Sequence, residues 1–171
     1  MKSVFLVGFM GAGKSTVGQL AAEELGMSFV DLDARIEERQ GADVAGIFLS
    51  KGEEVFRDLE SLELERVCTE PPAVVACGGG IVIRDANRRV LNDCGSVVYL
   101  RVTAGEALAR VGDVSSRPLL AQGGPAAAQT LLAARESLYG AVADITVDTV
   151  GRSPEDVAAD VVDALARLEE C

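Results

Sequence analysis

Residues 8–15 read Gly8-Phe9-Met10-Gly11-Ala12-Gly13-Lys14-Ser15. This stretch matches the phosphate-binding pattern G-x-x-x-x-G-K-[ST] at every defined position. It follows a short apolar run, Val4–Val7, and precedes a helical pattern over residues 14–25, which is the strand-loop-helix setting that the pattern requires. We therefore predict a loop whose backbone N–H groups surround phosphate oxygens, and not a chance glycine-rich turn.

The side chains of this loop fit the chemistry of a nucleoside triphosphate. Glycines let the backbone curl so that successive N–H groups point inward. Lys14 can reach the β- and γ-phosphates, the Ser15 hydroxyl can hold Mg²⁺, and Thr16 can add a contact near the α-phosphate. The loop predicts nucleotide binding but does not name a second substrate. Its predicted binding residues are Gly11, Ala12, Gly13, Lys14, Ser15 and Thr16.

Composition limits the chemistry further. The chain has 171 residues and a mass of 17.8 kDa, so we expect one domain over residues 1–171 with a sizeable core. Hydrophobic residues make up 49% and charged residues 25%, as in ordinary soluble globular proteins. The absence of histidine excludes Ser-His-Asp triads, Cys-His pairs and His-ligated zinc or iron sites. Proton transfer and metal binding must use carboxylates, lysine, thiols, hydroxyls or water.

The formal net charge is -11, which argues against binding to nucleic acid or to anionic membranes. The basic residues are 13 arginines and 3 lysines. A coding bias toward arginine is one interpretation. The other is that some arginines bind phosphate or carboxylate through planar, bidentate contacts, and the two do not exclude each other.

The cysteine pattern and the N-terminus favour a cytoplasmic location. None of the four cysteines (Cys68, Cys77, Cys94 and Cys171) forms a C-x-x-C pair, so we expect reduced thiols. The N-terminal apolar run is too short for a signal peptide, and no stretch approaches the roughly 20 apolar residues of a membrane span. We expect no membrane partner and a monomer.

Short β-rich runs alternate with longer helical segments, with no repeat and no linker. The predicted strands are Val4–Val7, Ser28–Leu32, Ala73–Cys77, Val97–Val102 and Ile145–Val147. The predicted helices lie near residues 14–25, 34–40, 43–50, 53–68, 84–93, 104–111, 126–140 and 154–169. This alternation predicts an α/β fold with a parallel sheet covered on both faces. Ligands of such sheets gather at the carboxyl ends of the strands.

Two carboxylates follow the second predicted strand, in the sequence Asp31-Leu32-Asp33. Strand side chains alternate, so we expect Asp31 and Asp33 on one side and Leu32 on the other, at the carboxyl end of the strand. One carboxylate can assist Mg²⁺, and the other can accept a proton or hydrogen bond from an attacking hydroxyl. The alternative is an acidic N-cap of the next helix. The neighbouring phosphate loop favours the functional interpretation.

Other segments carry further candidates. In Gly52-Glu53-Glu54-Val55-Phe56-Arg57-Asp58-Leu59-Glu60, Arg57 and Glu60 are three residues apart on a helix, so Glu60 can hold the guanidinium; a solvated surface pair is the alternative. Gly78-Gly79-Gly80 after a strand permits a ligand close to the backbone, or forms a flexible turn. Residues 112–124 suit either a lid with glycine hinges or a plain surface loop. The arginines that remain open to either interpretation are Arg110, Arg117, Arg135 and Arg152.

Taken together, these segments resemble the shikimate kinase family, within the P-loop nucleoside-monophosphate-kinase group. The resemblance covers nearly the whole chain. It rests on GFMGAGKST at 8–16, DLD at 31–33, GEEVFRDLE at 52–60, CGGG at 77–80, RPLL at 117–120, RESLY at 135–139 and GRSP at 151–154. It implies a three-layer α/β/α P-loop kinase fold with a five-stranded parallel sheet of order 2-3-1-4-5.

The resemblance also implies roles. Shikimate would be held by Asp33, Arg57, the glycines Gly78, Gly79 and Gly80, and Arg135. Ser15 would bind Mg²⁺, with Asp31 next to the ion's ligands or contacting the ion through water. Arg117, on a lid at about 112–124, would reach the transferring phosphate. Arg110, Arg152 and Pro154 would lie on the adenine side. Residues 34–60 would form the substrate-binding region.

The expected reaction is the ATP-dependent phosphorylation of the shikimate 3-hydroxyl, a step of chorismate and aromatic amino-acid synthesis. Lys14, Asp33 and Arg117 would be the residues at the reacting groups. One alternative is another small P-loop kinase, of the gluconate or nucleotide type, which would lack the combined DLD, FRxxE and GGG segments. A second is a catalytically silent ATP-binding regulator. Such proteins usually lose the P-loop lysine or the substrate carboxylate, and both are present here.

Overall fold

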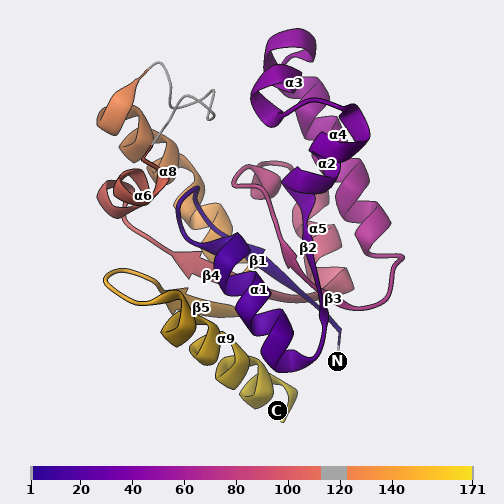
Figure 1. Cartoon of the computed structure of the whole chain (residues 1–171), viewed down its shortest axis with the longest axis vertical. Coiled ribbons are helices and arrows are strands. Elements are labelled where there is room, and N and C mark those ends of the chain that lie inside the picture. Colours follow the sequence, from indigo (N-terminus) through magenta and orange to yellow (C-terminus); the bar gives the residue numbers. More distant parts are fainter. Residues whose placement is uncertain (1, 113–122, 171) are drawn as a thin grey trace.

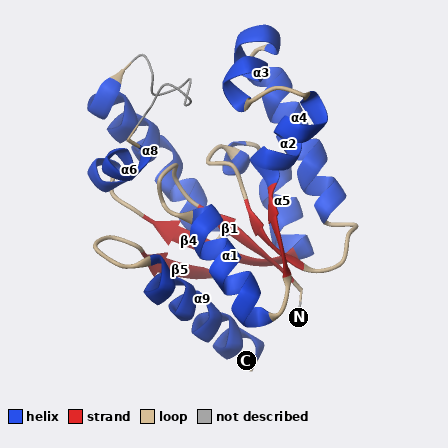
Figure 2. Ribbon diagram, viewed as in Figure 1, coloured by secondary structure: helices blue, strands red, loops and turns tan. Residues whose placement is uncertain are grey.

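The computed structural model describes residues 2–112 and 123–170. Its centre is a five-stranded parallel sheet (Figure 2) in the order β2-β3-β1-β4-β5. This confirms the predicted α/β class and strand order. The strands are β1 (Ser3–Val7), β2 (Ser28–Asp31), β3 (Ala73–Ala76), β4 (Gly95–Arg101) and β5 (Ile145–Asp148).

Helices cover both faces of the sheet. The helices α1 (Lys14–Leu25) and α9 (Pro154–Glu169) pack together on one face, in front of the strands in Figure 1. On the opposite face, α5 (Asp85–Cys94) and α8 (Gly124–Val142) pack against β4. The sheet interior is apolar, and Phe5, Leu6 and Val98 have no exposed surface. Burial on both faces explains why these strands read as continuous apolar runs.

The remaining helices stand at one end of the sheet. They are α2 (Leu32–Gln40), α3 (Val44–Lys51), α4 (Glu53–Val67), the short 3₁₀ helix η1 (Ile81–Ile83) and α6 (Ala104–Val111). In Figure 1, α2, α3 and α4 form one projection and α6 with the start of α8 forms another. A small second core of Ile36, Ile47 and Phe56 holds the first projection together.

The strand register brings distant segments to one edge. Asp31 pairs with Ala76, and Leu6 also pairs with Ala76. The carboxyl ends of β1, β2 and β3 therefore lie side by side, and the segments that follow them leave the sheet at the same place. This is the edge where parallel α/β sheets bind ligands.

Most predicted elements are confirmed with ends shifted by one or two residues, and the boundary between β2 and α2 bears on the site. Strand β2 ends at Asp31, and Leu32 begins α2. The Asp31 carboxylate caps that helix by accepting a hydrogen bond from the Ala34 N–H at 3.2 Å. The argument from strand alternation is therefore wrong for Asp33, which lies in the first turn of α2. The predicted cap of α9 is confirmed, because the Ser153 hydroxyl accepts from the Asp156 N–H at 3.1 Å and Pro154 is the first helical residue.

The predicted lid is not tested, and the prediction about membrane spans is tested only for the described helices. Arg117 and most of the predicted lid lie in residues 113–122, outside the described part of the chain. None of the helices described is both long enough and apolar enough to cross a membrane.

Candidate active site

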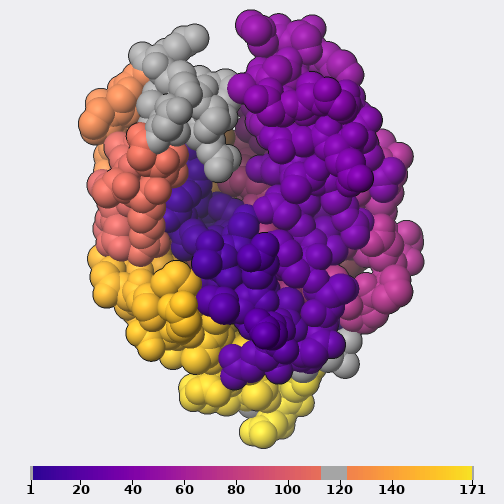
Figure 3. All heavy atoms as spheres, in the orientation of Figure 1, coloured from indigo at the N-terminus to yellow at the C-terminus, as the bar shows by residue number. Residues whose placement is uncertain are grey.

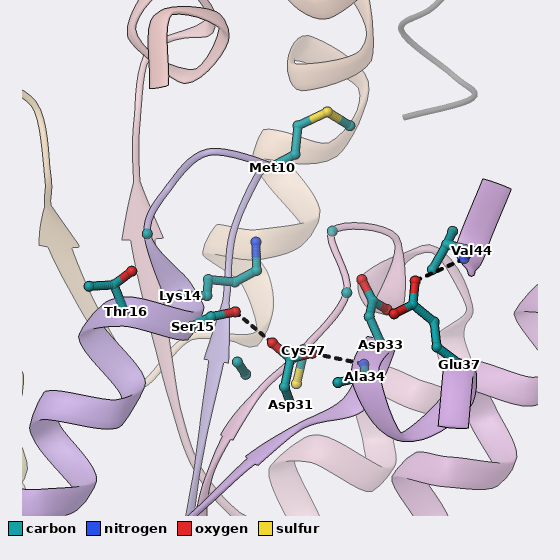
Figure 4. Close-up of a pocket in the computed structure, with 14 residues that line it drawn as sticks. Met10, Lys14, Ser15, Thr16, Asp31, Asp33, Ala34, Glu37, Val44 and Cys77 are labelled. Atoms are coloured by element: carbon teal, nitrogen blue, oxygen red, sulfur yellow. Dashed lines mark hydrogen bonds between the residues drawn. The ribbon is translucent and has the colours of Figure 1, made fainter. Parts of the chain in front are cut away.

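A cavity of about 360 Å³ lies at the carboxyl edge of the sheet. Figure 3 shows the surface hollowed between the segment of α2 and α3 and that of α6, with early residues at the floor. The phosphate loop, Asp31, Asp33 and the first two glycines of the triple glycine all line it. In Figure 4, Lys14 comes from the loop side and Asp33 from the α2 side. The structure therefore brings together three segments that are far apart in the sequence.

The phosphate loop depends on its glycines. Gly11 and Gly13 have φ values of 74° and 91°, in the region that disfavours other L residues. A Cβ on Gly8 would lie 2.5 Å from the Leu100 carbonyl oxygen. Among the described residues no side chain caps the N-terminus of α1, and the first residues of this helix line the cavity, so its positive dipole end is available to a ligand there. Lys14 Nζ donates to the carbonyls of Gly8 at 2.8 Å and Phe9 at 3.0 Å, which folds its ammonium over the loop.

Two oxygen donors meet beside the loop. The Ser15 hydroxyl donates to Asp31 Oδ2 at 2.6 Å, so Asp31 both caps α2 and contacts the first turn of α1 (Figure 4). Across the described residues there is no group of three or more acidic or cysteine side chains that could enclose a metal ion. One hydroxyl and one carboxylate suit Mg²⁺, which keeps several waters and takes phosphate oxygens as further ligands.

Asp33 stands where two cavities meet. It lines the first cavity and also a smaller one of about 60 Å³, which Arg57, Glu60 and Arg135 line as well. Met10, Gly78 and Gly79 also border both. The helical position of Asp33 therefore places its carboxylate between the phosphate loop and a group of buried charges.

Arg57 and Glu60 form a buried ion pair and not a solvated surface pair. Arg57 Nη1 lies 2.5 Å from Glu60 Oε2, and the two residues are 6% and 1% exposed. A second bond of 3.2 Å joins Arg57 Nη2 to Glu53, and the guanidinium lies 5.5 Å from the ring centre of Phe56. One edge of the guanidinium is therefore fixed by carboxylates and aromatic contacts.

Burial controls the protonation of this pair. Desolvation raises the pKa of Glu60 to about 7, although the charge and hydrogen bond of Arg57 act in the opposite direction. The nearby charge of Asp33 raises it further, and that of Arg135 lowers it. The pKa of Arg57 is raised by its acidic partners despite burial, so this arginine stays charged. The site therefore holds one carboxyl group that titrates near neutral pH.

The triple glycine lies against these charges. A Cβ on Gly78 would lie 2.6 Å from Glu60 Oε1 and 2.7 Å from Asp33 Oδ1. A Cβ on Gly80 would lie 2.6 Å from Arg57 Nη2 and closer still to Nη1. Arg135, from α8, is 5% exposed and reaches the same cavity beside Gly79. The glycines therefore allow the backbone to approach the charged groups, and are more than a flexible turn.

A third cavity of about 380 Å³ lies on the other side of the phosphate loop. Gly11, Gly13 and Thr16 line it, together with Arg110, Arg152 and Pro154. Arg110 donates to Gly11 O at 3.3 Å and to Thr149 O at 2.6 Å, and it pairs with Glu106. Arg152 pairs with Asp160 at 2.6 Å. The predicted adenine-side residues are thus grouped around one cavity that adjoins the loop.

Cys77 lines the first cavity but is poorly suited to react. It is 2% exposed, and burial raises the pKa of its thiol. A protonated, buried thiol is a weak nucleophile. Cys68, Cys77 and Cys94 are all free thiols, as predicted.

Several lining residues escaped the sequence analysis. Glu37 accepts from the Val44 N–H at 2.9 Å and closes the first cavity, and Phe48 covers the Arg57 side of the second. Thr149 anchors Arg110. Tyr139 reaches Gly79 from α8. Glu37 and Phe48 lie within the expected substrate-binding region 34–60, and Tyr139 ends the quoted RESLY segment four residues after Arg135.

The chain is similar to known proteins over nearly its whole length. The family model described as shikimate kinase matches residues 10–166. The shikimate kinase of Pseudomonas fluorescens (strain Pf0-1) is 44% identical over 169 residues, covering 98% of each chain. A solved structure, the shikimate kinase from Acinetobacter baumannii in complex with shikimate, has a TM-score of 0.94 and 36% identity, and covers 98% of this chain and 94% of that one.

A gluconokinase from Sinorhizobium meliloti 1021 has a TM-score of 0.68 and 23% identity, with coverage of 99% of this chain and 94% of that chain. This likeness extends to the fold alone. The family match spans most of this chain and the identity to the Pseudomonas protein extends over nearly all of it. The chain belongs to the shikimate kinase family.

Proposed function

We propose that this protein transfers the γ-phosphate of ATP to the 3-hydroxyl of shikimate, giving ADP and 3-phosphoshikimate. The observation that carries the proposal is the adjacency of the two cavities. A phosphate loop lines one, a pocket with two buried arginines adjoins it, and Asp33 borders both. A phosphoryl donor and a small anionic acceptor would therefore meet at Asp33.

The arginines of the smaller cavity suit a single carboxylate. Arg57 and Arg135 are both buried, and Arg57 is held on one edge by Glu60 and Glu53. Fixed guanidinium groups bind carboxylates with strong, directional hydrogen bonds. In a chain with a net charge of -11 they create a local positive site. We assign to them the carboxylate of shikimate, and to Asp33 and Gly78–Gly80 its ring.

Phosphoryl transfer needs alignment of the two reactants and neutralisation of charge on the phosphate oxygens. In our proposal Lys14 and the N–H groups of Gly11–Thr16 stabilise the phosphates. Asp33 orients the acceptor hydroxyl and accepts its proton as the new bond forms. Arg110, Arg152 and Pro154 border the nucleobase. Arg117 stays a prediction for the transferring phosphate, because it lies outside the described residues.

We propose Mg²⁺ as the metal, held by Ser15 with Asp31 next to it. The 2.6 Å contact between these oxygens and the small number of protein ligands both fit that ion. When bound, Mg²⁺ neutralises charge on the β- and γ-phosphates. Asp31 keeps the Ser15 hydroxyl oriented toward the cavity.

We further propose that the chain works as a single domain and as a monomer in the cytoplasm. The described cysteines are free thiols, as expected in a reducing compartment. We expect neither nucleic acid nor membrane as a partner. Sedimentation at working concentration tests the monomer, since a dimer would change the sedimentation coefficient directly.

The test of function is ADP release from Mg-ATP with shikimate, gluconate, a nucleoside monophosphate, or no acceptor. We expect fast release with shikimate alone. Release with another acceptor would keep the assignments of the phosphate loop and overturn those of Arg57, Arg135 and Gly78–Gly80. ATP binding without release with any acceptor would favour the regulatory alternative.

A further inference from the structure

Tyr139 lies on α8, four residues after Arg135, but has no role in the mechanism above. Its side chain is fully buried, and its hydroxyl lies 2.5 Å from the Gly79 carbonyl oxygen. A carbonyl oxygen can only accept, so the tyrosine hydroxyl is the donor. This bond joins α8 directly to the triple glycine.

Arg135 lies beside the same group. Arg135 and Tyr139 are four apart on α8, so their side chains lie on one face of the helix. Arg135 Nη1 lies 3.8 Å from the place that a Cβ on Gly79 would take. The glycine whose carbonyl accepts from the Tyr139 hydroxyl is therefore the one that Arg135 adjoins.

Packing fixes the Tyr139 ring independently of the hydrogen bond to Gly79. The ring stacks on Tyr99 of β4, with ring centres 5.2 Å apart and an interplanar angle of 25°. Burial raises the pKa of Tyr139 to about 12, against the effect of Arg135, so the hydroxyl keeps its proton at neutral pH. The Tyr99 hydroxyl is also buried, but it has no hydrogen-bond partner among the described residues. The two tyrosine rings thus pack against each other, but of the two hydroxyls only that of Tyr139 makes a hydrogen bond within the described residues.

We propose that Tyr139 is a positioning residue of the shikimate site, whose hydroxyl fixes the Gly79 backbone beside Arg135. The inference rests on the proposed function, since Gly79 and Arg135 are both assigned to shikimate. Without the hydroxyl, the Gly79 carbonyl loses its donor. The Gly79 backbone then gains freedom that shikimate binding must remove. Tyr139 does not line the cavity on the other side of the phosphate loop.

The test compares Tyr139→Phe with the matched control Tyr99→Phe. Both variants keep the stacked rings, and each removes one buried hydroxyl. We expect Tyr139→Phe to raise the KM and Kd for shikimate about tenfold, with the KM for ATP unchanged. Tyr99→Phe should leave both constants within about twofold of wild type, because its hydroxyl lacks a partner in the described structure. Thermal unfolding of both variants reports any general loss of stability.

A second measurement separates positioning from simple stability. In an Arg135→Lys background, Tyr139→Phe should raise the KM for shikimate by a smaller factor. The lysine that replaces Arg135 cannot make the planar contacts whose alignment with Gly79 the hydroxyl maintains. Equal shikimate constants in the two phenylalanine variants would overturn the inference, and so would full additivity with Arg135→Lys or an equal rise in the KM for ATP. If the wild-type chain neither bound nor phosphorylated shikimate, the proposed function would fail together with this inference. An active wild type with an unaffected Tyr139→Phe refutes the role of Tyr139 alone.

Discussion

Replacing Gly80 by alanine perturbs the site without touching the phosphate loop. The backbone of Gly80 has φ -98° and ψ 2°, which alanine can adopt. The added Cβ would lie 2.6 Å from Arg57 Nη2 and nearer to Cζ and Nη1, whereas ordinary contacts begin at 3.4 Å. To restore an ordinary contact, Arg57 Nη2 must therefore withdraw by about 0.8 Å, and Nη1 by more.

The size of the effect follows from how Arg57 is held. Its guanidinium is bonded to Glu60 and Glu53 and packed beside Phe56, so it cannot withdraw without losing some of those contacts. A misplacement of about 1 Å can cost on the order of 100-fold in a positioned reaction. We expect the kcat/KM for shikimate to fall by about 10- to 100-fold in Gly80→Ala, with the KM for ATP unchanged. Overpacking should cost about 1–3 kcal/mol of unfolding free energy.

The assay is steady-state ADP release with shikimate varied at saturating ATP, and then with ATP varied. Gly140→Ala, on α8, is the matched control, because in the described part of the chain no atom outside the backbone of that helix lies within 4 Å of the added Cβ. That variant should keep wild-type kinetics and gain up to about 1 kcal/mol of stability from helix propensity. An unchanged kcat/KM for shikimate in Gly80→Ala would refute the reasoning, since Arg57 could then be moved without consequence.

Three further substitutions test other parts of the site. Arg57→Ala should raise the KM for shikimate by about 100-fold, because it removes a buried cationic partner. The KM for ATP should stay within twofold of wild type. An equal rise in the KM for ATP would mean that Arg57 is misassigned. Asp33→Asn should lower kcat by at least about 100-fold while circular dichroism stays native, and wild-type turnover would remove this carboxylate from the mechanism. Glu60→Gln should abolish a pH dependence of shikimate binding near 7. In wild type the neutral form of Glu60, present below that pH, leaves the site more positive and favours the shikimate anion. Calorimetry in buffers of different ionisation enthalpy should then show proton uptake on binding in wild type and none in the variant.

Local sequence was sufficient to predict the phosphate loop. Strand, glycines, lysine and helix are contiguous there, and the backbone angles that glycine allows are a property of the residue itself. The alternation of apolar strands with helices likewise predicted the parallel sheet, and the family resemblance supplied the strand order. The pairing of Arg57 with Glu60 followed from their spacing on one helix, but their burial did not.

Strand alternation misplaced Asp33 because the sheet ends one residue earlier than its apolar pattern suggests. Asp31 stops β2 by capping α2, and this choice between strand and helix is made by the hydrogen bond to Ala34 and by the contact with Ser15. Asp33 nevertheless lines the cavity at the carboxyl edge of the sheet, and its function stays a prediction.

The sequence by itself determined the nucleotide loop, the class of fold and the set of charged side chains available for a second substrate. Only the tertiary structure decided which of those charges are buried together and how they are held. The hydroxyl of Tyr139 meets Gly79 across 60 positions, and Arg110 meets Thr149 across 39. The near-neutral pKa of Glu60 depends on burial and on Arg57, Asp33 and Arg135 at once. Contacts of this kind arise when packed elements exclude water around polar groups, and no local periodicity of the chain encodes them.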